Sequence, residues 1–399
     1  MRVLLSWLLL AIVCYGTSQT TIEFWHSMGS TEEAVDLLAE AFNASQSDYR
    51  VEPRYVGAYP EGQTRLQAAF GGSAQPSLFQ AELSFFPFLI DVGAVANLSD
   101  LTAGLPEAFV NDFFPGLWQY GEVDNERYGL PWNMSMPVLF YNASAFEQRR
   151  AAAPSTWQEF EAAAARLTTR QTRGFIAVAD SWTFEMMVTT RGGRLVTEDG
   201  RPDFTNEKSI EALQLLRQMV ESGHAIPRNL AETDFAILDF VRTKAMMVFA
   251  SIANWPDAKR FAVAFDIAAS PVPTSAGSNV PLGGAQLVVM AGASEAERQG
   301  AFAFWQFLMQ PENIRTWVEA SFYLPVRRSA LPLLEPWYLE DPNRRAALSQ
   351  LETAIPRPRI PDYATWQRYL EEAIEKAIKQ SVPAETALEE AQRRAETTP

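Results

Sequence analysis

Residues 20–29 read TTIEFWHSMG, and this stretch predicts a strand that runs directly into a helix. The residues around Ile22–Trp25 alternate as in a β-strand. The strand then delivers an indole and an imidazole, those of Trp25 and His26, to the start of the next helix. We expect this stretch to begin an α/β fold and to form a ligand-binding wall, although Trp25 also suits a core position and His26 a helix-start hydrogen bond.

The chain continues to alternate helical and strand patterns. The next elements expected are a helix capped by Ser30 or Thr31, a strand at 50–55, a helix at 63–70 and a strand at 77–81. This βαβαβ order predicts a mostly parallel sheet with helices on both faces. In such sheets ligands lie beyond the carboxyl ends of the strands, which is where residues 57–59 and Glu82 are then expected.

The middle of the chain has a different character. Residues 128–142 read YGLPWNMSMPVLFYN, one long extended run with Pro131 and Pro137. Two prolines suit a central strand poorly, so this run is expected to cross between two lobes. Thr156 and Glu159 then form a capping box at a helix start. Later strands are expected at 174–178, 245–250, 265–271 and 284–290, and later helices at 206–220, 295–309, 311–319, 344–354, 365–379 and 383–394.

Charge and the first residues suggest where the protein works. The net charge of −15 over 399 residues argues against nucleic acid as a partner. Residues 1–18 resemble a secretory signal, because Arg2 precedes a short apolar run and small residues precede a cut after Ser18. Cys14 is the only cysteine and could carry a lipid anchor, but the residues before it fit a lipidation motif poorly. We expect a soluble, cysteine-free mature chain in the periplasm or at the extracytoplasmic face.

Signatures of catalysis are missing from the sequence. It contains no GxGxxG after a strand, GxxxxGK[ST], HExxH or GxSxG motif. His26 and His224 are the only histidines, which leaves little material for a Ser-His-Asp triad or a histidine metal site. A glycosidase-like carboxylate pair stays open. We therefore expect a binding protein rather than an enzyme, with no cofactor and no metal.

Several motifs resemble one known family. They are FWHSMG at 24–29, GAY at 57–59, PWNMSMPVLFYNASAF at 131–146, LGGAQLVVM at 282–290, and YLP at 323–325. In this order they resemble the periplasmic substrate-binding proteins of ATP-binding-cassette importers, the extracellular solute-binding proteins, and within them a branch that takes glycerol phosphates. The resemblance implies a two-lobed α/β fold of type II, like maltose-binding protein, whose cleft closes on the ligand by hinge motion.

The resemblance also implies how the chain is divided. The first lobe is expected to hold residues 19–130 and about 256–310, and the second lobe residues 131–255 and 311–399. Hinge crossings are expected near 128–142 and 282–290.

The resemblance further suggests site residues. On the first lobe, Trp25 and His26 are expected in the wall, Tyr59 to stack or hydrogen-bond, and Glu82 to bind hydroxyl groups. Trp182 is expected to stack on the ligand, Ser135 and Ser251 to donate hydrogen bonds, Gly283 and Gly284 to offer main-chain N–H groups, and Tyr323 to close over the ligand. Arg368 is expected to pair with the phosphate, with Arg359 as the alternative. Arg357 and Arg359 also suit ion pairs with the acidic surface.

The function implied is capture of glycerol-3-phosphate or a glycerophosphodiester, by a monomer that delivers it to the membrane permease subunits of an importer. The chain departs from the family pattern at Met134 and Ala250, where the family has hydroxyls. A neutral oligosaccharide as ligand therefore stays open, as does a secreted carbohydrate-active enzyme.

Overall fold

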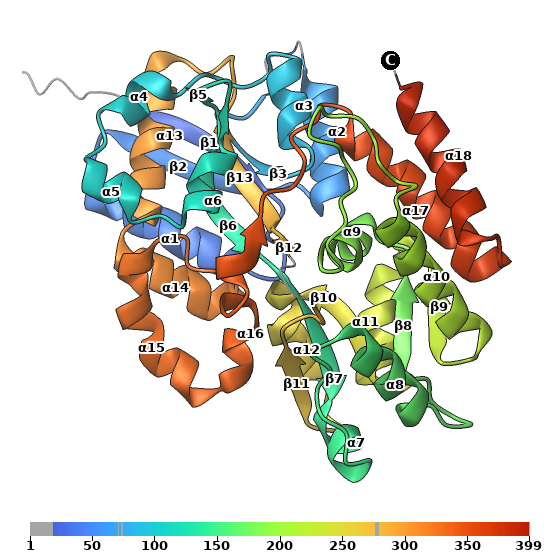
Figure 1. The fold of residues 1–399 in the computed structure, drawn as a ribbon. Coiled ribbons are helices and arrows are strands. Elements are labelled where there is room, and N and C mark those ends of the chain that lie inside the picture. The colour runs from blue at the N-terminus through green and yellow to red at the C-terminus, as the bar shows by residue number, and fades with distance from the viewer. Residues whose placement is uncertain (1–18, 71, 73–74, 276–278, 399) are drawn as a thin grey trace, which may run out of the picture.

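The computed structural model describes residues 19–398 except 71, 73–74 and 276–278. The expected signal segment at 1–18, with Cys14, lies outside the described residues. Two β-sheets with surrounding helices organise the chain (Figure 1). Among the described helices, none combines the length and apolar character needed to cross a membrane.

The first sheet has the strand order β2-β1-β3-β13-β6. Its strands are β1 (Thr20–His26), β2 (Tyr49–Tyr55), β3 (Leu78–Glu82), β6 (Leu130–Ser135) and β13 (Gly283–Val289). The expected βαβαβ start is confirmed, because β1 runs parallel to both β2 and β3. The sheet as a whole is mixed rather than mostly parallel, because β13 lies antiparallel between β3 and β6.

The elements around this sheet form what we call the first lobe. Its helices are α1 (Glu32–Ser45), α2 (Tyr59–Ala69), α3 (Phe86–Asp91), α4 (Ser99–Ala103), α5 (Glu107–Asn111), α6 (Pro115–Tyr120), α13 (Glu295–Leu308), α14 (Pro311–Ser321) and α15 (Leu331–Glu340), with the short hairpin β4 (Glu122–Val123) and β5 (Glu126–Arg127). Phe24 of β1 and Phe42 of α1 both contact Phe304 of α13, with ring centroids 6.0 and 5.2 Å away. These aromatic contacts join the sheet to α1 and α13.

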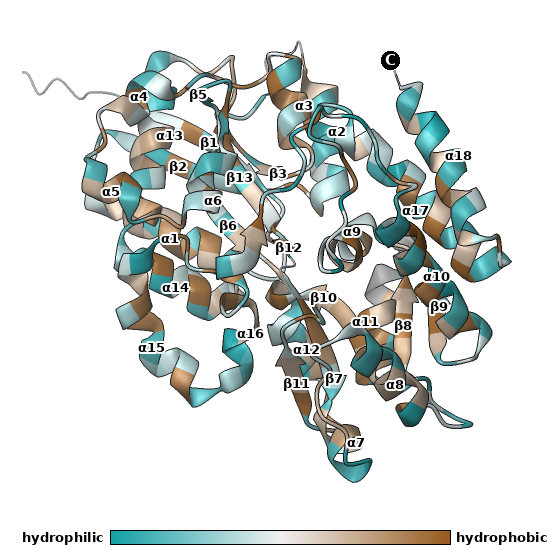
Figure 2. Cartoon of the chain, viewed as in Figure 1, coloured by the Kyte–Doolittle hydropathy of each residue, from teal (hydrophilic) through white to brown (hydrophobic). Residues whose placement is uncertain are grey.

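The second sheet has the antiparallel order β10-β7-β11. Around it lies the second lobe, with strands β7 (Pro137–Asn142), β8 (Phe175–Val178), β9 (Ala225–Arg228), β10 (Met247–Ser251) and β11 (Ile267–Ser270), and helices α7 (Ala143–Gln148), α8 (Trp157–Leu167), α9 (Ser181–Thr189), α10 (Glu207–Glu221), α11 (Thr233–Val241), α12 (Trp255–Phe261), α17 (Tyr363–Gln380) and α18 (Ala384–Glu396). Figure 2 shows the outward side of α18 as largely hydrophilic, whereas Ala387, Leu388 and Ala391 of the same helix are buried.

The chain passes from the first sheet to the second at Met136, between β6 and β7. The two prolines occupy positions that a sheet tolerates. Pro131 lies in β6, which is an edge strand, and Pro137 is the first residue of the central strand β7. The chain returns to the first sheet between Ser270 and Gly283. The second crossing therefore precedes the expected segment 282–290, most of which forms β13 inside the first sheet.

Parts of the expected division differ from the structure. Strand β11, expected in the first lobe, pairs with β7 in the second sheet. Helix α14, expected in the second lobe, packs against α1. Sequence pattern does not reveal which sheet a strand joins once the chain has crossed, because both sheets bury similar apolar strands.

The single helix expected at 344–354 is also wrong. The segment forms short turns instead, η4 (Pro342–Arg344), α16 (Arg345–Leu348) and η5 (Leu351–Thr353), before the strand β14 (Ala354–Ile355) that pairs with β12 (Val280–Pro281). The side chain of Gln350 donates to the carbonyl of Pro137 at 2.8 Å and accepts from the N–H of Val272 at 2.9 Å. These hydrogen bonds tie the segment to the second lobe, so it is held by them and not by the regular hydrogen bonds of one continuous helix.

The capping box at the start of α8 is confirmed and provides a test of local stability. The hydroxyl of Thr156 accepts from the N–H of Glu159 at 3.2 Å. We expect Thr156→Ala to lower the free energy of unfolding by about 1 kcal/mol, measured by chemical denaturation. Thr31 is the matched control, because it stands at the start of α1 without a side-chain capping bond. An equal loss in Thr31→Ala would contradict the capping explanation.

Candidate ligand-binding cleft

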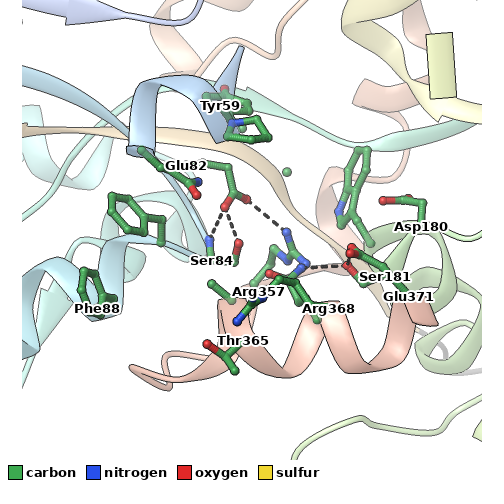
Figure 3. A pocket seen from close by; sticks show the side chains of 18 of the residues that line it. Tyr59, Glu82, Ser84, Phe88, Asp180, Ser181, Arg357, Thr365, Arg368 and Glu371 are labelled. Carbon is green, nitrogen blue, oxygen red and sulfur yellow. Dashed lines mark hydrogen bonds and ion pairs between the residues drawn. The ribbon is translucent and has the colours of Figure 1, made fainter. Parts of the chain in front are cut away.

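A cavity of about 890 Å³ lies between the two lobes. The first lobe contributes residues of α2, the end of β3, α3 and the start of β13, and the second contributes residues of α9, the end of β10 and α17. Figure 3 shows Tyr59 and Glu82 on one side and Thr365, Arg368 and Glu371 of α17 on the other. The volume suits a small-molecule ligand.

Most of the expected site residues line this cavity. They are Tyr59, Glu82, Ser135, Trp182, Ser251, Gly283, Gly284, Tyr323 and Arg368. They come from segments far apart in the chain, and the fold brings them together. Trp25, His26 and Arg359 are not among the lining residues.

Trp25 and His26 are held inside the first lobe. The indole of Trp25 is buried and donates to Glu23 at 2.7 Å. The imidazole of His26 is also buried, and its Nδ1 accepts from the N–H of Met28 at 3.3 Å. Burial lowers the pKa of His26 to about 4, so the ring is neutral at physiological pH. These two residues therefore do not form the expected ligand wall. Trp25 occupies a core position, and His26 makes a hydrogen bond at the end of the strand.

Arg359 points away from the cavity. Its guanidinium donates to the main-chain carbonyls of Gln119 and Glu122 in the first lobe. The ion pair with the acidic surface considered for Arg359 is likewise absent among the described residues. Arg357 is the arginine of this segment that lines the cavity.

Two tyrosines, Tyr59 and Tyr323, line the cavity on the first lobe, and the buried Asn133 supports one of them. The Nδ2 of Asn133 donates to the hydroxyl of Tyr59 at 3.0 Å. The ring of Tyr323 stacks on Trp317 with centroids 5.7 Å apart, and Trp317 stacks on Trp132 at 4.7 Å. Burial raises the pKa of both tyrosines, so their phenols stay neutral and can donate and accept hydrogen bonds.

The two glycines of β13 permit close contacts, Gly283 with the second lobe and Gly284 with the neighbouring strand β6. A Cβ at Gly283 would lie 2.5 Å from the indole of Trp182, whose Nε1 donates to the carbonyl of Leu282 at 3.2 Å. Gly284 has φ +105°, and a Cβ there would lie 1.9 Å from the carbonyl oxygen of Asn133. Trp182 lines the cavity, and because its N–H is already bonded to Leu282 it can offer a ligand only its ring.

Helix α17 presents a polar face to the cavity. Thr365, Arg368 and Glu371 recur at intervals of three residues and so share one side of the helix. Arg368 is exposed and makes no hydrogen bond or ion pair with any residue that the structure describes. The hydroxyl of Ser181 donates to Glu371 at 2.7 Å, and burial raises the pKa of Glu371 to about 7.

Arg357 is buried between carboxylates of both lobes. Its Nη1 donates to Glu82 at 3.1 Å and its Nε to Glu185 of α9 at 3.3 Å. The hydroxyl of Tyr363 also donates to Glu185, at 2.8 Å. Burial opposes the charge of Arg357, but Glu185 and Glu82 outweigh it and hold its pKa above the ordinary value.

The sequence did not point to every residue of the cleft. Lining residues that were not expected include Ser84, Phe85, Phe88, Asp180, Ser181, Arg357, Thr365, Gln367 and Glu371. The spacing of Thr365, Arg368 and Glu371 on an expected helix was a usable signal. Asp180 gave a weaker signal, because an aspartate before a helix is explained by capping alone, and its side chain does cap α9 by accepting from the N–H of Thr183. Within the described ranges no group of His, Cys, Asp and Glu side chains is arranged to hold a metal ion.

Comparison with known proteins agrees with this architecture. Residues 38–346 match the family described as bacterial extracellular solute-binding protein. The chain belongs to this family. Like other members, this solute-binding protein has two α/β lobes of the maltose-binding-protein type with a cleft between them.

Individual relatives are more distant. The sn-glycerol-3-phosphate-binding periplasmic protein UgpB of Escherichia coli (strain K12) is 27% identical over 380 residues, covering 88% of this chain and 86% of that protein. The structure of UgpB from Mycobacterium tuberculosis in complex with glycerophosphocholine has a TM-score of 0.86 at 22% identity, covering 95% of this chain and 98% of that one. The GacH receptor of Streptomyces glaucescens, also solved with acarbose, has a TM-score of 0.84 at 21% identity, covering 96% and 100%.

The backbone at Gly284 provides a test of the close approach. We expect Gly284→Ala to lower the free energy of unfolding by about 2 kcal/mol or more, because the positive φ and the carbonyl of Asn133 both oppose a Cβ. Gly93→Ala is the matched control, since Gly93 also has a positive φ but no atom within 4 Å of the added Cβ. Denaturant unfolding of both variants checks this, and equal losses would contradict a steric cause.

The raised pKa of Glu371 predicts a pH-dependent stability. Glu371 binds its proton more tightly in the folded state than in the unfolded chain, so its contribution to stability falls as pH rises from about 4.5 to about 7. We expect Glu371→Gln to raise the melting temperature at pH 8 by about 2 °C and to leave it unchanged near pH 4.

The neighbouring Glu372 is the control for this experiment. Arg394 pairs with Glu372 and lowers its pKa. Glu372→Gln should therefore lower the melting temperature at pH 8. Shifts of the same sign in the two variants would show that the effect does not come from the burial of Glu371.

Proposed function

We propose that this protein is an extracytoplasmic receptor that captures glycerol-3-phosphate or a glycerophosphodiester and delivers it to the permease subunits of an ATP-binding-cassette importer. The observation that carries the proposal is the gathering of Tyr59, Glu82, Ser135 and Arg368 in one interlobe cleft. In this proposal the protein binds its ligand without chemical change, and hinge closure completes the polar contacts.

The donors in the cleft suit a phosphate group. Arg368 has an exposed guanidinium without a hydrogen bond to any described residue, and its donors can form charge-assisted bonds with a phosphate even though its charge also acts on Glu372. The hydroxyl of Ser135 makes no hydrogen bond within the part of the chain that the structure describes, although the residue is buried. A ligand would satisfy it on closure.

The cavity also suits a polyol. Glu82 can accept hydroxyl groups, and the rings of Tyr59, Trp182 and Tyr323 can cover carbon-bound hydrogens. The sequence similarity to a sn-glycerol-3-phosphate-binding protein over most of the chain supports the same ligand class. The periplasmic location of that relative and the family description support an extracytoplasmic site of action.

Calorimetry with arginine variants tests the phosphate contact. We expect Arg368→Met to weaken binding of glycerol-3-phosphate or glycerophosphoglycerol about 10- to 100-fold, because charge-assisted bonds to the phosphate are lost. Arg359→Met is the matched control, because Arg359 lies outside the cavity lining, and it should change affinity less than twofold.

A neutral oligosaccharide is the second candidate ligand. Carboxylates at Glu82, Asp180, Asp362 and Glu371 together with aromatic rings line the cleft, and such a set also suits sugar hydroxyls. Saturable binding of a disaccharide that is unaffected by Arg368→Met, with no binding of either phosphate compound, would establish this candidate in place of the first.

A further inference from the structure

Arg357 joins the two lobes through a buried group of three charges. Glu82 lies at the end of β3 in the first lobe, and Glu185 lies in α9 of the second. Arg357 stands between them, in the segment that leads from β14 into α17. The side chains of Arg357 and Glu185 are only 4% and 3% exposed, and that of Glu82 is 14% exposed.

The guanidinium of Arg357 has little left to offer a ligand. Nη1 is bonded to Glu82 and Nε to Glu185. Nη2 is buried and lies 3.2 Å from Glu185, although it makes no hydrogen bond among the described residues. Arg357 lines the cavity, but a ligand anion that took the place of Glu82 on Nη1 would leave a carboxylate unpaired and break a link between the lobes.

Glu82 itself is held firmly in this arrangement. Its Oε1 faces Arg357, and its Oε2 accepts from both the N–H and the hydroxyl of Ser84 (Figure 3). The carboxylate is therefore fixed at the cavity wall, where it repels any second negative charge on a ligand.

The other charged residues of the cleft are mostly acidic as well. Asp180, Asp362 and Glu371 line the cavity, and Arg368 is the one further cation among its described lining residues. The cleft thus offers an available positive charge for one negative charge of a ligand, within an otherwise acidic lining.

We propose that Glu82 and Glu185 are specificity residues that neutralise Arg357 and so select a ligand with a single negative charge, a polyol phosphodiester, against a phosphate monoester dianion. This inference rests on the proposed function and decides between its two ligands. The two carboxylates need no contact with the phosphate to do so, because Glu185 acts through Arg357.

Calorimetry at pH 8 and constant ionic strength tests this selection with two ligands that share a glycerol unit. Glycerol-3-phosphate is a dianion at that pH, since the second pKa of a phosphate monoester is about 6. Glycerophosphoglycerol is a monoanion. We expect the wild-type chain to bind the diester at least tenfold more tightly. Glu82→Gln and Glu185→Gln should each shift the affinity ratio at least tenfold toward the monoester.

Tyr363→Phe is the matched control, because it removes a hydrogen bond to Glu185 without changing any charge. The affinity ratio of this variant should stay within twofold of the wild type. The ratio also separates selection from damage, since a distorted cleft weakens both ligands together. Because Glu82 lies at the cavity wall, Glu82→Gln keeps the test open if the buried Glu185→Gln variant melts before it can be titrated.

The outcomes separate this inference from the proposed function. Equal or tighter binding of the monoester by the wild type overturns the selection but leaves the receptor for glycerol phosphates standing. An unchanged affinity ratio in the folded carboxylate variants does the same. Absence of binding to both phosphate compounds overturns the proposed function and this inference with it.

Discussion

The close approach of β13 to its neighbours is the constraint on which the cleft depends. Gly283 leaves room for the indole of Trp182, and Gly284 lies against the carbonyl of Asn133 in a conformation that only glycine adopts easily. A side chain at either position would push β6, β13 and α9 apart. Both glycines line the cavity, so their close packing shapes the cleft between the lobes.

Charge is the second organising element of the cleft. A buried arginine is stable only when its charge is compensated, and Arg357 finds compensation in one carboxylate from each lobe. The same arrangement leaves Arg368, on the exposed face of α17, as the cation that a ligand can reach. Among the described lining residues Arg368 is therefore the one exposed cation, and its place on α17 fixes where a ligand can meet it.

Local patterns predicted the elements whose cause is local. The capping box of Thr156 and Glu159 begins α8 as expected, since both partners lie within one turn. The parallel pairing of β1 with β2 and β3 followed from the βαβαβ order. The segment at 344–354 failed this reasoning, because Gln350 bonds to Pro137 and Val272, which are remote in sequence.

The same division holds for the candidate site. Motif resemblance indicated Tyr59, Ser135, Gly283 and Tyr323, which the fold brings to one cavity. Spacing alone did not distinguish Arg357 from Arg359, because two residues of the same type in an irregular proline-rich segment carry no periodic signal. The residue pattern also did not show whether His26 lies in a ligand-binding wall or in the core, because a strand that ends in either place has the same alternation.

The sequence by itself determined the class of fold and the stock of aromatic, hydroxyl and charged groups available for binding. Tertiary structure decided which of these groups share the cleft and which charges are already paired. The reason is physical: helices, strands and caps depend on residues a few positions apart, whereas the state of Arg357 depends on Glu82 and Glu185, residues that only the packing of two lobes brings within 3.3 Å of it.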